Sequence, residues 1–199
     1  MQNSYALLYP SRVVFGWGSR AKLDEVLTTL MPGDPASRRL FFVCAGSIVR
    51  NGVLEELASC VQPSPVVGHH ASIPDDPPLA AVDAVTSNIR QHGANVVVAV
   101  GGGSVLDVGK AAAVLAGRQP WEVEPYFNGE QAITSPGLPF VALPTTAGTG
   151  AEITKNAVLT DTAAHLKKSL RSPYMVPAAA IVDPELTVTM PARLTAESG

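Results

Sequence analysis

Short apolar runs alternate with segments of helical periodicity along most of the chain. Runs of strand length occupy residues 40–44, 65–69, 95–100 and 140–143, and NVVVAV at 95–100 is apolar without alternation, as in a strand covered on both faces. Apolar residues recur at helical spacing over 53–61, and further helices are predicted over 79–91 and 104–116. This order predicts an α/β fold, a Rossmann-like open and mostly parallel sheet with helices on both faces.

The pattern changes after residue 152. Apolar segments at 157–160 and 166–170 flank the polar stretch DTAAH, which predicts a β-hairpin on the edge of the sheet. Residues 178–182 read as one more strand, and Met190-Pro191 opens a segment that resembles the start of a helix. We therefore expect an α/β domain over residues 1–190 and the truncated start of a second domain over 191–199.

Composition narrows the function classes. Of the 199 residues, 46% are hydrophobic and 16% charged, which argues against disorder. The formal net charge of −3 gives no electrostatic reason to expect a nucleic-acid partner or an anionic membrane. The apolar runs are far shorter than a membrane-spanning helix, and the first residues lack the features of a signal peptide. With two cysteines, Cys44 and Cys60, expected to be buried thiols, the sequence predicts a soluble cytoplasmic protein.

A glycine loop, Gly101 to Gly103 followed by Ser104, lies between the 95–100 strand and the next helix. Glycine lets the backbone approach a pyrophosphate closely, and the N–H groups of a helix start attract an anion. The alternative is a tight turn with Ser104 as the N-cap and Asp107 as its capping-box partner. Lys110 would then simply pair with Asp107 at i, i+3 spacing. Asp107 is otherwise a candidate residue of the ligand site.

A threonine loop follows the 140–143 strand, with Thr145, Thr146 and Thr149 among two glycines. Its hydroxyls could hydrogen-bond phosphates, ribose or an amide; alone, an ordinary Ser/Thr-rich turn would be the better interpretation. Because both loops follow strands of one sheet, a shared ligand site is favoured.

These motifs resemble the iron-dependent (group III) alcohol dehydrogenases. The stretches that carry the resemblance are GGGSVLDVGKAAA at 101–113 and PTTAGTGAEITKNAVL at 144–159. The stretches PSRVVFGWGS, SLRSP and AAIVDPELT support it, so the resemblance covers essentially the whole chain. Glycerol dehydrogenases share the glycine loop but match the threonine loop poorly. Maleylacetate reductases also match the threonine loop less well, and they are the main alternative family.

The resemblance implies an NAD(P)-dependent oxidoreductase that interconverts an alcohol and an aldehyde or ketone by metal-assisted hydride transfer. It implies a nucleotide-binding α/β domain followed by an all-helical domain with a divalent metal, Fe²⁺ or Zn²⁺, in the full-length enzyme. The family's metal-binding aspartate and first histidine fall just beyond Gly199, so we expect neither a metal ligand nor a catalytic residue here. The full-length enzyme is expected to be a homodimer or larger. A chain that ended naturally at Gly199 would instead be a non-catalytic nucleotide-binding module.

Carried over residue by residue, the resemblance assigns Gly102, Gly103 and Ser104 to the pyrophosphate. It assigns the three threonines to the pyrophosphate and nicotinamide ribose. Asn156 and Lys167 match further cofactor-contacting positions, and the neighbouring Lys168 is the alternative to Lys167. His69 and His70 are interpreted as a structural strand edge rather than metal ligands.

The turn after the 40–44 strand bears on the choice of dinucleotide. Many NAD-preferring members carry an acidic residue there, which accepts hydrogen bonds from the adenosine 2′-OH. Here the strand leads into Ala45, Gly46 and Ser47, with Arg50 one helical turn on and no acid before Glu55. This turn resembles that of NADP-using, butanol dehydrogenase-like members. We expect Gly46 and Ser47 to bind the 2′-phosphate of NADP; the alternative is that Arg50 is solvated and the enzyme uses NAD or NADP.

Overall fold

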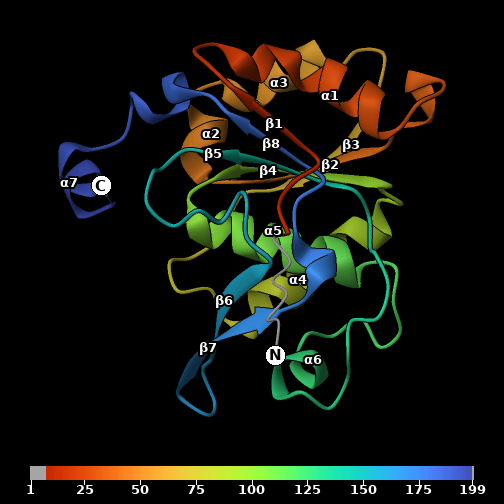
Figure 1. Ribbon diagram of the computed structural model, residues 1–199, viewed down its shortest axis with the longest axis vertical. Coiled ribbons are helices and arrows are strands. Elements are labelled where there is room, and N and C mark those ends of the chain that lie inside the picture. Colours follow the sequence, from red (N-terminus) through yellow and green to blue (C-terminus); the bar gives the residue numbers. More distant parts are fainter. Residues whose placement is uncertain (1–7, 199) are drawn as a thin grey trace, which may run out of the picture.

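Six parallel strands form the central sheet, in the order β1-β8-β5-β4-β2-β3 (Figure 1). The computed structural model describes residues 8–198. The sheet confirms the predicted open parallel α/β architecture. Its strands are β1 (Arg12–Phe15), β8 (Ala179–Val182), β5 (Phe140–Pro144), β4 (Val96–Gly101), β2 (Leu40–Cys44) and β3 (Val66–His70).

Helices cover both faces of the sheet, with α1 and α3 on one side and α4 and α5 on the other (Figure 1). The predicted helix over 79–91 is confirmed residue for residue. Within residues 8–198, no helix has the length and apolar character needed to cross a membrane. The α-helices are α1 (Leu23–Leu30), α2 (Gly46–Arg50), α3 (Val53–Cys60), α4 (Leu79–Gln91), α5 (Gly103–Leu115), α6 (Glu124–Asn128) and α7 (Ala192–Ser198). Short 3-10 helices span Ser19–Lys22 (η1), Pro35–Ser37 (η2), Pro173–Met175 (η3) and Pro184–Thr187 (η4).

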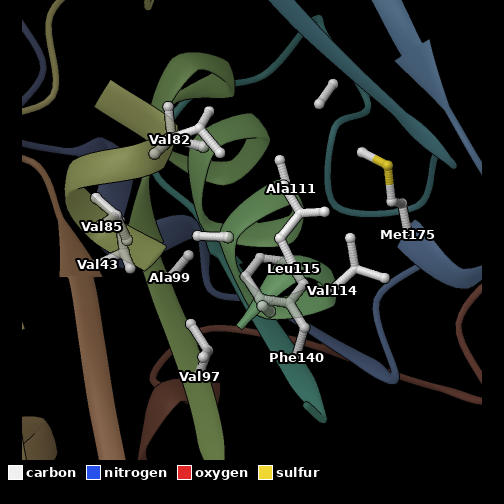
Figure 2. Close-up of a cluster of buried hydrophobic side chains, with 14 of the residues drawn as sticks. Val43, Val82, Val85, Val97, Ala99, Ala111, Val114, Leu115, Phe140 and Met175 are labelled. Atoms are coloured by element: carbon white, nitrogen blue, oxygen red, sulfur yellow. The ribbon is translucent and has the colours of Figure 1, made fainter. Parts of the chain in front are cut away.

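Side chains of the central strands alternate between two buried cores. On β2, Phe41 and Val43 belong to the core shared with α4 and α5, whereas Phe42 and Cys44 belong to the core shared with α1 and α3. Figure 2 shows the first of these cores, in which β4 residues face the apolar sides of α4 and α5. An apolar run without alternation suits this position because both of its faces are buried.

The predicted hairpin exists, but its placement on the edge of the main sheet was wrong. Strands β6 (Asn156–Asp161) and β7 (Leu166–Arg171) form a separate antiparallel sheet that lies beyond α5 (Figure 1). Ala157 and Leu159 join the buried core that contains α5. The apolar face of the hairpin therefore packs on a helix, and the Thr160 N–H donates to Pro77 O at 2.9 Å.

Helix α5 consequently lies between the main sheet and the hairpin, and nearly all of it is buried. Its approach to the sheet is close: a Cβ at Gly109 would lie 2.9 Å from Ala99 Cβ. Asp107 and Lys110 are the two charged residues of this helix, and both are buried. Since burying a charge is costly unless it is paired and hydrogen-bonded, these two side chains need partners inside the fold.

Asp183 directly follows β8, and its hydrogen bonds link the ends of β1 and β8. Its residue exposure is 1%. Its carboxylate accepts hydrogen bonds from the N–H groups of Gly18, Arg20 and Glu185 at 2.9–3.1 Å. The Arg20 guanidinium lies 3.0 Å from Oδ2 of the same carboxylate. Burial alone would raise the pKa of Asp183, but these donors together hold it below its ordinary value.

Both cysteines are free thiols, as expected. Cys44 is buried at the end of β2, where burial raises its pKa to about 11, with a smaller contribution from the charge of Glu55. Cys60 ends α3 and is only partly buried. Cys44 therefore remains a neutral thiol at physiological pH, consistent with a structural role.

Candidate functional site

The strand order of the sheet changes direction between β2 and β4. From β2 the chain passes outward to β3, and from β4 it passes the opposite way to β5. The helices that follow β2 and β4 lie on opposite faces, because α3 belongs to one core and α5 to the other. Such a switch point opens a crevice beyond the carboxyl ends of the two strands, which is where ligands of open α/β sheets bind.

The glycine loop lies at this crevice. β4 ends at Gly101, Gly102 is the N-cap of α5, and the helix begins at Gly103. The alternative interpretation of Ser104 as N-cap with Asp107 in a capping box was therefore wrong, because the cap lies two residues earlier. No side chain caps α5, so its first N–H groups remain available to an anion.

The threonine loop lies directly against the glycine loop. The Thr145 N–H donates to Gly101 O at 3.0 Å. A Cβ at Gly102 would lie 3.4 Å from Thr146 Oγ1, and a Cβ at Gly103 would lie 3.0 Å from Thr149 Oγ1. The two motifs, some 40 residues apart in sequence, thus form one surface, and the glycines are what permits their close approach.

A cleft of about 290 Å³ opens beside these loops. It brings together six of the eleven residues that the sequence singled out. These are Gly103, Ser104, Asp107, Thr149, Asn156 and Lys167. Sequence reasoning missed the other lining residues, which are Asp76, Pro77, Ala151, Thr154 and Val158.

Gly102, Thr145 and Thr146 lie next to the cleft through the contacts above, but Gly46 and Ser47 do not line it. The turn expected at Gly46 and Ser47 is instead the first turn of the short helix α2, with Ala45 as the N-cap. A Cβ at Gly46 would lie 3.0 Å from Arg50 Nη1, so the guanidinium folds back over this helix start. These residues follow β2, beside the crevice.

The ion pair predicted between Asp107 and Lys110 is present, with Lys110 Nζ 3.4 Å from Asp107 Oδ1. The other oxygen, Oδ2, accepts a hydrogen bond from the Val158 N–H at 2.8 Å. Burial raises the pKa of Asp107, against the opposing effects of Lys110 and the Val158 N–H. Burial likewise lowers the pKa of Lys110, and the charge of Asp107 opposes this. Each charge thus stabilises the other in a site that water scarcely reaches.

At the mouth of the cleft, Lys167 Nζ lies 2.5 Å from Asp76 Oδ1. Both side chains are exposed, and exposed ion pairs contribute little to stability, so a ligand could separate them at low cost. The neighbouring Lys168 lies elsewhere, with its Nζ 4.4 Å from the centre of the Phe127 ring. Of the two lysines, Lys167 is therefore the one that faces the cleft.

The sequence of the chain matches that of a known protein family. A family model described as iron-containing alcohol dehydrogenase matches residues 10–184. The chain belongs to this family. The long-chain-alcohol dehydrogenase 1 of Geobacillus thermodenitrificans is 31% identical over 196 residues, which are 97% of this chain and 48% of that protein. The sulfoacetaldehyde reductase of Bilophila wadsworthia is 40% identical over 124 residues, 62% of this chain and 32% of that protein.

Solved structures of the family share the fold. The sulfoacetaldehyde reductase from Bifidobacterium kashiwanohense in complex with NAD⁺ has a TM-score of 0.89 at 30% identity, covering 99% of this chain and 50% of that one. The NADH-dependent butanol dehydrogenase A from Thermotoga maritima has a TM-score of 0.86 at 26% identity, covering 98% and 48%. The chain thus spans about half the length of these solved relatives.

The metal that the family name implies does not fit the residues described. Residues 8–198 contain no group of three or more histidine, cysteine, aspartate or glutamate side chains that could hold an ion. His69 and His70 lie on the edge strand β3, and His70 Nδ1 is 3.0 Å from Asn88 Nδ2. Burial lowers the pKa of His70. Both histidines thus lie on an edge strand of the sheet, the position that the sequence indicated.

Proposed function

We propose that this chain is the NAD(P)-binding part of an oxidoreductase that interconverts an alcohol and an aldehyde or ketone. The observation that carries the proposal is the contact of the glycine loop with the threonine loop beside one cleft at the switch point of the sheet. Membership of the iron-containing alcohol dehydrogenase family supports it, as does the NAD⁺ complex of a relative. When bound, the nicotinamide ring supplies the hydride chemistry, and the protein holds and orients it.

In this proposal the uncapped start of α5, with Gly102, Gly103 and Ser104, holds the pyrophosphate. The loop threonines contact the pyrophosphate and nicotinamide ribose. Asn156 and Lys167 contact the ribose region from the hairpin side of the cleft, which Asp107 also lines.

We further propose a domain boundary near residue 190, with residues 1–190 forming the dinucleotide-binding domain. Helix α7 begins at Ala192 and buries none of its residues in this domain. A helical domain, a divalent metal and assembly into a homodimer or larger are proposed for the complete enzyme, and an alcohol or aldehyde is its proposed substrate.

NADP(H) is expected to bind this chain at least as tightly as NAD(H). The turn after β2 offers no carboxylate to repel a 2′-phosphate, and Arg50 lies against Gly46 at the same helix start. The butanol dehydrogenase named above is NADH-dependent, so the expectation rests on these residues alone. Ala45→Asp should reverse the order of the two affinities, because its carboxylate repels the 2′-phosphate and accepts a hydrogen bond from a ribose hydroxyl.

Parallel calorimetric titrations of the two dinucleotides measure this preference. Ala45→Asn is the matched control, because it has the shape of aspartate without the charge, and it should leave the order unchanged. A preference of about tenfold for NAD(H) in the unmodified chain, worth ~1.4 kcal/mol, would contradict the interpretation of this turn. Failure of both dinucleotides to bind would contradict the proposed function itself.

The 199-residue chain alone is expected to show no alcohol dehydrogenase activity and to retain no stoichiometric iron or zinc. Catalytic zinc sites, for example, use about three protein ligands, and the described residues supply no such set. Elemental analysis after purification, with chelator-treated protein as the control, tests the metal content. One tightly held metal per chain would show that a ligand set had been missed.

A further inference from the structure

Lys110 has an unusual environment for a lysine in the middle of a helix. Its residue exposure is 1%. Its Nζ donates to Ala151 O at 2.6 Å, Asn156 O at 2.8 Å and Thr154 O at 3.2 Å, with Thr154 Oγ1 at 3.4 Å. Apart from Asp107 Oδ1 at 3.4 Å, the oxygens around the ammonium group belong to a single segment, residues 151–156.

This segment joins the threonine loop to the hairpin, and Ala151 and Thr154 lie outside every helix and strand. Their carbonyls therefore depend on bonds other than those of regular structure. Taking a lysine out of water costs free energy that an apolar residue at this position would not cost. Apart from Asp107, whose carboxylate lies 3.4 Å from the ammonium, α5 around Lys110 is apolar. The ammonium therefore pairs with Asp107 and also holds the segment through its carbonyl oxygens.

The same segment forms a wall of the cleft. Ala151, Thr154 and Asn156 line it together with Gly103 and Ser104 at the start of α5. One helix therefore supplies both the proposed pyrophosphate contacts and, two turns later, the group that fixes this wall. Asp107, one turn before Lys110, holds the next part of the chain through the Val158 N–H.

We propose that Lys110 is a positioning residue for the dinucleotide: its buried ammonium fixes residues 151–156 at the separation from α5 that the bound cofactor requires. The inference rests on the proposed function and deepens it, since Lys110 acts through the segment and touches no ligand. A purely structural lysine would change the stability of the fold without changing the affinity of folded protein for the cofactor.

The test measures NADH binding by fluorescence on the 199-residue chain and three variants. Lys110→Ala removes three methylenes and the ammonium, which together have the composition of n-propylammonium. We expect affinity to fall about tenfold or more, because three carbonyls of the segment lose a charged donor. Adding n-propylammonium should restore a large part of it, whereas tetramethylammonium at equal ionic strength, which has no N–H, should not.

Two further variants separate positioning from folding. Lys110→Met keeps most of the side-chain volume, so it should fold and still show the loss of affinity. Lys168→Met, which removes the lysine over Phe127 outside the cleft, should bind as the unmodified chain does. Circular dichroism gives the folded fraction to which each affinity refers.

The outcomes are distinct. Affinity lost in both Lys110 variants and restored by n-propylammonium in Lys110→Ala supports the proposal. Unmodified affinity in folded Lys110→Met, or a loss in Lys110→Ala that n-propylammonium does not relieve, overturns it. A chain that fails to bind NADH before any substitution contradicts the proposed function instead.

Discussion

Gly103→Val should weaken NAD(H) and NADP(H) binding by about tenfold or more, which corresponds to at least ~1.4 kcal/mol. Gly103 is the first residue of α5, and a Cβ there would lie 3.0 Å from both Cγ2 and Oγ1 of Thr149. A valine would therefore push the threonine loop away from the helix start. It would also cover the N–H groups that the proposed pyrophosphate needs, and both effects act on the same ligand.

Calorimetry measures the affinity, and Gly117→Val is the matched control. Gly117 follows the end of α5, and a Cβ added there would meet nothing within 4 Å. The control should bind both dinucleotides as the unmodified chain does. An unchanged affinity in folded Gly103→Val would show that the glycine loop does not approach the ligand.

Asp183→Ala should lower the free energy of unfolding by about 2–4 kcal/mol. The carboxylate accepts three backbone N–H bonds and pairs with Arg20 while almost fully buried, so its removal leaves those donors without their acceptor. Arg20 keeps contacts with Glu56 and Glu185, which limits the loss. Asp34→Ala is the control, because Asp34 accepts a similar bond from the Ala36 N–H on the surface and should cost about 1 kcal/mol or less.

The contribution of Asp183 to the free energy of unfolding decreases as the pH falls. Its pKa is lowered in the folded chain, so the carboxylate's charged form stabilises the fold above the unfolded pKa of about 3.9. That stabilisation is lost as pH falls through the lower folded pKa. Urea unfolding should therefore show that the unmodified chain and Asp183→Asn differ in their free energy of unfolding. This difference should be constant above about pH 5 and should narrow below about pH 4. A difference that grows on acidification would contradict this.

Elements with a strong period or a clear composition could be predicted from the sequence. Helix α4 and the buried strands β2 and β4 are examples, because their apolar patterns report burial directly. Strand β1 was missed because its four residues alternate between half-buried and exposed, which gives little signal. The five-residue helix α6 was missed for a similar reason. Short elements depend on tertiary contacts rather than on their own pattern.

The parts of the site that belong to sequence motifs could be predicted. The parts that depend on contacts between distant segments could not. Gly103 and Thr149 were found because each follows a strand of the same sheet. Asp76 was missed because it enters the cleft only when the hairpin folds back beside it, a long-range contact that no local pattern shows. The hairpin was misplaced for the same reason, since an amphipathic strand does not reveal whether a sheet or a helix covers it.

The neighbours β1 and β8 come from opposite ends of the described chain, and the Ser11 hydroxyl beside them reaches Ala178 O across 167 residues. On the ribosome, β1 therefore emerges long before β8, its single sheet neighbour within residues 8–198. At about 5–20 residues per second, β1 waits on the order of ten seconds or more for its partner. The other strands have their neighbours earlier, so the nascent sheet is expected to assemble from β2, β3 and β4 outward and to gain β1 last.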